Sequence, residues 1–279
     1  MIEFNLKTKT LIGENSIMQI IPFIEDNNFN KIGIILDQAL TENKFISKLI
    51  KEIKLKNILK IFWIYDLPFE PDYISLDKIK LLFKDNKKSK VDAIISIGGG
   101  SVMDFAKGIS TLLTNHGSAL EYRGFPKNIS PSIPLIAIPT TAGTASEVTF
   151  NAVFTDTESG KKLGINTHYN FPVLAVLDSN MTLDCPYSVA LSSGLDALVH
   201  TFESFACNNS NNYTRMFAKQ AFKLLFENIE NALIKNDSKS RENMLFGAHL
   251  AGISLFNSGS GPAGAMSYPL GVVNKVPHG

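Results

Sequence analysis

Short apolar segments that alternate with amphipathic ones constrain the fold more than any other feature of this 279-residue chain. Five apolar segments, mostly rich in β-branched residues and bounded by turn formers, have the pattern of buried strands. They cover residues 32–36, 58–64, 93–97, 135–138 and 174–177. Amphipathic segments such as 44–54 and 77–87 lie between them and are typical of helices. Strands that are apolar throughout need cover on both faces, so the pattern predicts a parallel sheet between two layers of helices.

The second half of the chain has a different pattern. From about Tyr187 onward the strand signal stops, and residues 189–206, 213–231 and 240–256 show helical periodicity. A length of 279 residues corresponds to just under two typical domains. We therefore expect an α/β domain with a parallel sheet over residues 1–182, followed by an all-helical domain over residues 183–279.

Composition and charge exclude several classes of protein. Lys and Arg number 27 against 26 Asp and Glu, so the net charge of +1 gives no overall attraction to nucleic acid or anionic membranes. Two cysteines are too few for a disulfide framework or a cysteine-rich zinc site. The sequence shows neither a signal peptide nor an apolar run near the roughly 18 residues of a membrane span. We expect a soluble, cytoplasmic protein that binds neither nucleic acid nor membrane.

Two loops that follow predicted strands are candidates for ligand binding. The run of glycines at 98–100, followed by Ser101, comes directly after the strand at 93–97 and opens a helix. Glycines let the backbone approach a ligand, and free N–H groups at a helix start attract phosphate. The alternative is an ordinary capping box, with Ser101 as N-cap and Asp104 three residues later. A second loop, residues 139–147, follows the strand at 135–138 and is rich in hydroxyl and small side chains. Open α/β sheets bind ligands at the carboxyl ends of their strands, where both loops lie.

A further glycine-rich segment, residues 259–264, formally matches the G-x-G-x-x-G dinucleotide fingerprint. It follows a helical pattern instead of a strand, and the chain contains no acidic residue at the expected distance after it. We interpret this segment as a connection between two helices.

Asp196 and His200 are candidate metal ligands. They are four residues apart in a predicted helix and therefore share one helix face. Two such side chains can bind one ion, but the alternative is a hydrogen-bonded pair. Apolar neighbours favour partial burial of this face. His278 is a third candidate, whereas the remaining histidines lack an acidic or histidine partner at useful spacing and are expected to be structural. Those are His116, His168 and His249.

Taken together, four segments resemble the iron-containing (group III) alcohol dehydrogenase family. They are residues 98–110 (GGGSVMDFAKGIS), 139–149 (PTTAGTASEVT), 194–204 (GLDALVHTFES), and the pair 268–271 (YPLG) and 277–279 (PHG). The resemblance implies a dehydroquinate synthase-like architecture, with an NAD(P)-binding α/β domain and a helical metal and substrate domain. Family members usually continue with several helices beyond the Pro-His-Gly motif, so we expect a truncated or partial member.

The resemblance also implies roles for individual residues in cofactor binding. Asp37 falls where the family places an acid facing the adenosine ribose, which favours NAD over NADP because a carboxylate repels a 2′-phosphate. Further cofactor positions are matched by Gly98, Gly99 and Ser101 in the pyrophosphate loop, by Thr140, Thr141 and Thr144 in the second loop, and by Lys162 and Leu177.

The metal site implied by the resemblance lacks one of its four protein ligands. Asp196, His200 and His278 match three of the four usual ligands of a divalent metal, iron or zinc. Gly264 occupies the fourth position, and Tyr268 stands where the family carries a second, solvent-linked histidine. Three protein donors plus water still describe an adequate catalytic zinc site. If no metal binds, Tyr268 or a water held by Asp196 and His200 would supply the electrophile.

The activity that the resemblance implies is NAD(P)-dependent alcohol oxidation or aldehyde reduction, with a divalent metal polarising the carbonyl. The space at Gly264 leaves open a metal-weak or metal-independent reductase of a small anionic aldehyde such as phosphonoacetaldehyde. Two further alternatives are an NAD-binding pseudoenzyme and a phosphate-eliminating enzyme like dehydroquinate synthase. The expected partners are a small alcohol or aldehyde substrate and further copies of the chain, in a homo-oligomer such as a dimer.

Overall fold

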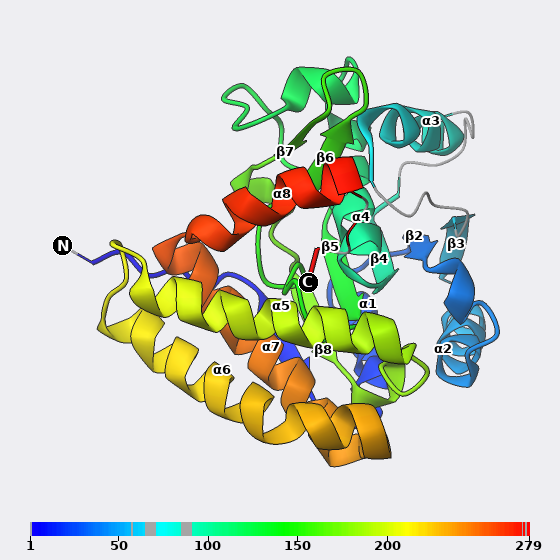
Figure 1. Cartoon of the computed structure of the whole chain (residues 1–279). Coiled ribbons are helices and arrows are strands. Elements are labelled where there is room, and N and C mark those ends of the chain that lie inside the picture. Colours follow the sequence, from blue (N-terminus) through cyan, green and yellow to red (C-terminus); the bar gives the residue numbers. More distant parts are fainter. Residues whose placement is uncertain (1, 57, 65–70, 85–90, 275, 277) are drawn as a thin grey trace.

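The computed structural model describes residues 2–56, 58–64, 71–84, 91–274, 276 and 278–279 (Figure 1). Its central sheet joins parallel strands in the order β1-β8-β5-β4-β2-β3. Their bounds are β1 (Lys9–Ile12), β2 (Lys31–Leu36), β3 (Leu59–Ile64), β4 (Ala93–Gly98), β5 (Leu135–Pro139) and β8 (Leu174–Leu177). All five predicted strands are present within one or two residues, and the parallel sheet is confirmed.

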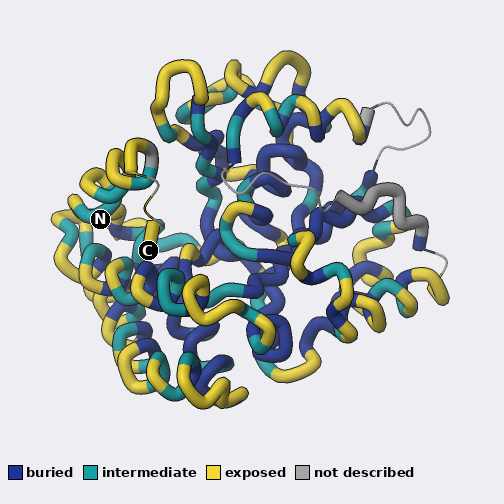
Figure 2. Tube along the Cα trace, turned by 45° about the vertical axis from the view of Figure 1, so that its right-hand side comes forward, coloured by how far each residue is buried: buried dark blue, intermediate teal, exposed yellow. Residues whose placement is uncertain are grey.

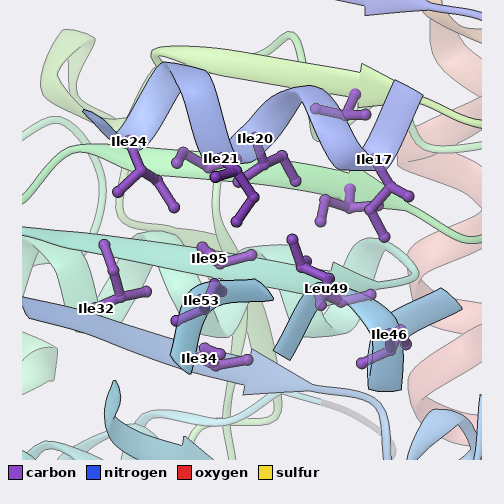
Figure 3. Close-up of a cluster of buried hydrophobic side chains, with 14 of the residues drawn as sticks. Ile17, Ile20, Ile21, Ile24, Ile32, Ile34, Ile46, Leu49, Ile53 and Ile95 are labelled. Atoms are coloured by element: carbon purple, nitrogen blue, oxygen red, sulfur yellow. The ribbon is translucent and has the colours of Figure 1, made fainter. Parts of the chain in front are cut away.

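Alternate residues of the strands face two separate cores, one on each side of the sheet. Ile34 of β2 and Ile95 of β4 point to the first core, which contains helices α1 (Ile20–Asp26) and α2 (Lys44–Leu55) (Figure 3). Ile35 and Ile94 point to the second, with α3 (Tyr73–Lys84) and α4 (Gly100–Thr114). The period of two along each strand thus gives both faces an apolar surface for helices to cover.

Side-chain caps set where the helices on the sheet begin. Asn43 Oδ1 accepts from the N–H groups of Phe45 (2.9 Å) and Ile46 (3.3 Å), so α2 begins at the predicted residue. The helix predicted over 77–87 begins earlier, at Tyr73, because Asp72 Oδ1 accepts from the Ser75 N–H at 2.8 Å. Residues 85–87 of that prediction lie outside the described part of the chain.

Two short β elements were not predicted. Strand β1 holds two polar and two apolar residues, too few for a pattern, and is defined by its register with β8, from Lys9 opposite Leu174 to Ile12 opposite Leu177. Strands β6 (Val153–Asp156) and β7 (Lys161–Gly164) form an antiparallel hairpin. A carboxylate stabilises its turn, because Asp156 Oδ1 accepts from the N–H groups of Glu158 and Ser159.

The second half of the chain is helical, as expected (Figure 1). Its helices are α5 (Tyr187–Ala206), α6 (Asn212–Glu230), α7 (Ser238–Ser258) and α8 (Pro262–Asn274). Helix α8 was not predicted, and the glycine-rich connection is shorter than expected because Pro262 already begins the next helix. Figure 2 shows buried residues concentrated in the middle of the molecule and exposed residues at its periphery. The division at residues 182 and 183 stays a prediction.

None of the helices in the described part of the chain has the length and apolarity needed to cross a membrane.

Candidate active site

The carboxyl ends of four adjacent strands bring the predicted cofactor residues to one edge of the sheet. Asp37 follows β2, Gly98 ends β4, Thr140 follows β5 and Leu177 ends β8. Backbone hydrogen bonds continue past the strand ends, from the Asp37 N–H to the Ile97 carbonyl (2.9 Å) and from the Thr140 N–H to the Gly98 carbonyl (3.1 Å). Parallel register therefore aligns loops that are more than 100 residues apart in the sequence.

The glycine turn after β4 leaves the start of α4 open to a ligand. Gly99 is the N-cap residue, with extended backbone at φ −78° and ψ −172°, and the described residues supply no side-chain cap there. The alternative capping box is therefore wrong, because Ser101 lies inside the helix and the Asp104 carboxylate accepts from the Val153 N–H and the Ser146 hydroxyl instead. The first-turn N–H groups of a 15-residue helix are a suitable site for a phosphate.

The second loop packs directly against the glycine turn. A Cβ on Gly100 would lie 2.7 Å from Thr144 Cγ2, so the two loops touch where a side chain would not fit. Residues 141–150 form bends and a turn, and Ala145 between Thr144 and Ser146 has a left-handed backbone with φ 53°. Conformations of this kind cost an alanine about 1–2 kcal/mol and need surrounding contacts to hold them.

A pocket lies between this loop and the helical half of the chain. Thr140 and Thr141 line it on the sheet side, Ser193 of α5 and Arg241 of α7 on the helical side, and Cys185 between them. Burial raises the pKa of the Cys185 thiol, while the Arg241 charge lowers it and the Asp37 charge raises it further. The Asp37 carboxylate is therefore close enough to this pocket for its charge to act there.

The other predicted cofactor residues have distinct surroundings. Asp37 Oδ1 accepts from the Ala39 N–H at 3.0 Å, and the described residues give Oδ2 no partner. Leu177 is buried at the end of β8. Lys162 lies on β7, outside the main sheet. Burial raises the pKa of Asp104, and the charges of Lys107 and Lys162 oppose that rise.

Asp196, His200 and His278 meet at one carboxylate oxygen. Asp196 Oδ1 lies 3.5 Å from His200 Nε2 and 3.6 Å from His278 Nε2. Both distances exceed those of good hydrogen bonds, but two ligand atoms at 2.0–2.2 Å from a tetrahedral ion are about 3.3–3.6 Å apart. As they stand, the described His, Cys, Asp and Glu side chains do not form a complete group of three or more around an ion position. The structure thus shows two donor pairs that share Asp196.

The surroundings of the two imidazoles differ. His200 Nδ1 is buried without a hydrogen-bond partner among the described residues, whereas Ser267 Oγ lies 3.3 Å from His278 Nδ1. Ser267 Oγ also donates to the Gly264 carbonyl at 3.1 Å, so one hydroxyl contacts both Gly264 and His278. A Cβ on Gly264 would meet no atom within 4 Å. The side chain of Tyr268 lies outside the described part of the structure.

Two buried groups beside the second loop were not predicted as part of the site. His249, expected to be structural, is buried on α7 with Nδ1 3.0 Å from Glu147 Oε1, a partner 102 residues away that spacing could not reveal. Lys107 is fully buried on α4, and a signal for it exists, since it interrupts the otherwise apolar stretch from Phe105 to Ile109.

Comparison with known proteins extends over both halves of the chain. The family model described as iron-containing alcohol dehydrogenase matches residues 7–179. The model described as the C-terminal part of the Fe-containing alcohol dehydrogenase family matches residues 190–279.

Individual relatives agree with the family models. Alcohol dehydrogenase 4 of Schizosaccharomyces pombe is 37% identical over 194 residues, which cover 69% of this chain and 46% of that protein. The sulfoacetaldehyde reductase of Bilophila wadsworthia is 34% identical over 259 residues, 92% of this chain and 62% of that protein. The crystal structure of sulfoacetaldehyde reductase from Bifidobacterium kashiwanohense in complex with NAD+ matches with a TM-score of 0.92 at 25% identity, covering 100% of this chain and 73% of that one. The chain thus spans about half of the yeast protein and less than two thirds of the Bilophila reductase.

Proposed function

The chain belongs to the iron-containing alcohol dehydrogenase family, and from this premise we propose that it transfers hydride between a nicotinamide cofactor and a small alcohol or aldehyde. The observation that carries the proposal is the shared edge at the carboxyl ends of β2, β4, β5 and β8. There an uncapped helix start, a carboxylate and a hydroxyl-rich loop lie side by side.

Each of these groups has a part in holding NAD. The N–H groups at the start of α4 would bind the pyrophosphate, because Gly99 and Gly100 place no side chain between backbone and ligand. Asp37 would accept from a ribose hydroxyl through its second oxygen, which also disfavours a 2′-phosphate. Thr140, Thr141 and Thr144 would line the far side of the cofactor, and Lys162 and Leu177 would complete the site.

Asp196, His200 and His278 would hold a divalent ion, iron or zinc. Their oxygen and imidazole donors suit such an ion. The distances from Asp196 Oδ1 to Nε2 of His200 (3.5 Å) and of His278 (3.6 Å) match the spacing of two ligands on one ion better than the length of a hydrogen bond. When bound, the ion would supply a Lewis acid that polarises the substrate carbonyl. The contact of His278 Nδ1 with Ser267 keeps Nε2 directed at Asp196. If no ion binds, Tyr268 or a water held by Asp196 and His200 would supply the electrophile.

NADH-dependent reduction of an aldehyde panel, with metal content measured on the same sample, tests this function. We expect NADH to bind and at least one aldehyde to be reduced, faster with added Zn²⁺ or Fe²⁺ than with a chelator. Cofactor binding without turnover across the panel would favour the pseudoenzyme, and absence of cofactor binding would reject the dehydrogenase.

A small anionic aldehyde is a second candidate substrate class. Two similar proteins are named sulfoacetaldehyde reductases, and the open space at Gly264 would accommodate a sulfonate or phosphonate group beside the proposed ion. Competition between sulfoacetaldehyde, phosphonoacetaldehyde and propionaldehyde tests this class. A higher kcat/KM for the uncharged aldehyde than for both anions would reject it.

The expected homo-oligomer and cytoplasmic location stay predictions. Size-exclusion chromatography with light scattering measures the first of them directly.

A further inference from the structure

We propose that Lys107 is a positioning residue for cofactor binding, and that it acts by holding the loop of residues 140–149 from the α4 side while His249 holds it from the α7 side. The inference rests on the proposed function, because it assigns the loop to the cofactor. Neither residue touches the glycine turn or the proposed metal ligands in the described structure.

Lys107 makes several contacts with the end of the loop. Its Nζ donates to Ser146 Oγ at 2.7 Å and to the Asn151 carbonyl at 2.7 Å, with a longer contact to Thr149 Oγ1 at 3.4 Å. Ser146 Oγ in turn donates to Asp104 Oδ1 at 2.8 Å, so the hydroxyl is fixed between a cation and a carboxylate. A fully buried ammonium needs such partners, and charge-assisted hydrogen bonds are the strong ones.

The neighbouring residue of the loop is held from the opposite side. Glu147 is buried, and its Oε1 lies 3.0 Å from Nδ1 of His249, which is also buried. His249 Nε2 lies 3.2 Å from Thr10 Oγ1 of β1. Ser146 is therefore bound to α4, and the next residue, Glu147, is bound to α7.

The hydrogen bonds of Ser146 and Glu147 support the strained backbone at Ala145. Ala145, directly before Ser146, has the left-handed φ of 53°, and a Cβ on Gly252 of α7 would lie 2.2 Å from the Ala145 Cβ. The strained backbone at Ala145 thus packs against Gly252, where α7 carries no side chain. Release of the anchors would let Ala145 relax and move Thr144, which contacts the glycine turn.

Three variants and a matched control test the inference. Lys107→Met removes the ammonium and keeps the chain length, and Lys107→Met combined with Asp104→Asn avoids an uncompensated buried carboxylate. Ser146→Ala removes the bridging hydroxyl alone. The control is Lys80→Met, because Lys80 is also buried and donates to a carbonyl, that of Gly117, in a different loop.

The readouts are the dissociation constant of NADH for the folded fraction, the KM for NADH against kcat, and hydrogen exchange of the loop amides. We expect the Lys107 variants to weaken NADH binding about tenfold and Ser146→Ala about threefold. KM for NADH should rise more than kcat falls. Exchange at 144–148 should speed up in the double variant and stay unchanged in Lys80→Met. A purely structural role would lower stability in both lysine variants and leave the NADH affinity of the folded fraction unchanged.

The outcomes separate this inference from the proposed function. NADH affinities within about twofold of the parent in both Lys107 variants would overturn the positioning role. If the parent itself does not bind NADH, the proposed function fails and the role of Lys107 in cofactor binding fails with it. Hydrogen exchange then decides only the anchoring of the loop: faster exchange confined to the loop supports it and unchanged exchange overturns it. If Lys107→Met does not fold, the double variant and Ser146→Ala carry the test.

Discussion

At the start of α4, the proposed phosphate site depends on the absence of side chains. Gly99 has an extended backbone that any residue can adopt, and a Cβ there would make ordinary contacts with Thr141 at 3.4–3.5 Å. The fold therefore tolerates a side chain at this position. What a side chain would obstruct is the approach of a ligand to the uncapped N–H groups.

Gly99→Val tests this assignment. The branched side chain would occupy the space in which the pyrophosphate must approach, so we expect NADH to bind at least about tenfold more weakly, with a smaller loss in Gly99→Ala. Fluorescence titration measures both affinities, and thermal melts check that the variants remain folded. Parent-like affinity in Gly99→Val would remove the phosphate from this turn.

Asp37→Ser separates the structural from the recognition role of that carboxylate. A serine can still accept from the Ala39 N–H and cap the short helix that follows, so the fold should be unchanged. The negative charge is lost, and we expect the preference for NADH over NADPH to fall by about tenfold or more. Dissociation constants for both cofactors check this. An unchanged ratio would exclude Asp37 from the ribose site.

Gly264→His tests the incomplete donor set. The position is open, with no atom within 4 Å of a Cβ, and the Gly264 carbonyl shares Ser267 with His278. An added imidazole should tighten binding of Co²⁺ or Zn²⁺ by about tenfold or more, whereas the matched Gly264→Ala should not. Calorimetric titration of the metal gives both values. Equal affinities would place the ion away from residue 264 or show that the three donors do not hold one.

Helix α4 connects the glycine turn to the core, and its packing depends on Gly108. A Cβ there would lie 2.7 Å from Leu76 Cδ2 and 2.8 Å from Phe154 Cζ, both fully buried side chains on α3 and β6. The helix can approach its neighbours closely because this position carries no side chain.

Gly108→Ala should therefore destabilise the protein although alanine favours helices. Overpacking costs about 1–3 kcal/mol and the helix preference returns about 1 kcal/mol, so we expect a net loss of up to about 2 kcal/mol in urea unfolding. Gly264→Ala, in the open position on α8, should gain up to about 1 kcal/mol. A gain at both positions would mean that α4 can shift away from α3 and β6 without cost.

What the sequence could predict at this scale depends on how local the signal is. The strands and the helices α5 to α7 follow from continuous apolar runs and helical periodicity, which nearby residues determine. Strand β1 has four residues and exists only because β8 offers it a partner. The pairing of Glu147 with His249 and the contacts of Lys107 depend on tertiary structure, so spacing could not reveal them. The open space at Gly264 could be expected only from the family resemblance, because it depends on how α8 is placed.

At the scale of the whole molecule, the second cofactor loop joins the two halves of the chain. Ala145 and Val148 pack with Leu250 and Ile253 of α7 in one apolar cluster, while Lys107 and Asp104 hold the same loop to helix α4. The pocket lined by Thr140 and Arg241 lies along this junction. The packing of the two halves and the proposed cofactor binding would therefore depend on the same short segment.

The buried lysine at this junction makes stability depend on pH in a defined direction. Burial lowers the pKa of Lys107 from 10.5 to about 8, against the opposing charges of Asp104 and Glu147. Between these values the unfolded chain binds more protons than the folded one, so the free energy of unfolding should rise with pH. The cost of burying the ammonium is fully present below about pH 8 and disappears near pH 10.5.

Relative to the double variant Lys107→Met with Asp104→Asn, which lacks both charges, the parent should gain about 1.4 kcal/mol per pH unit in this window, or roughly 3 kcal/mol in all. The comparison cancels the titration of surface lysines, which both proteins share. Urea unfolding of the two proteins at intervals across the window measures the difference. If the stability of the two proteins changed with pH in the same way, Lys107 would keep its ordinary pKa. Its hydrogen bonds to Ser146 and Asn151 and the charge of Asp104 would then compensate the cost of its burial completely.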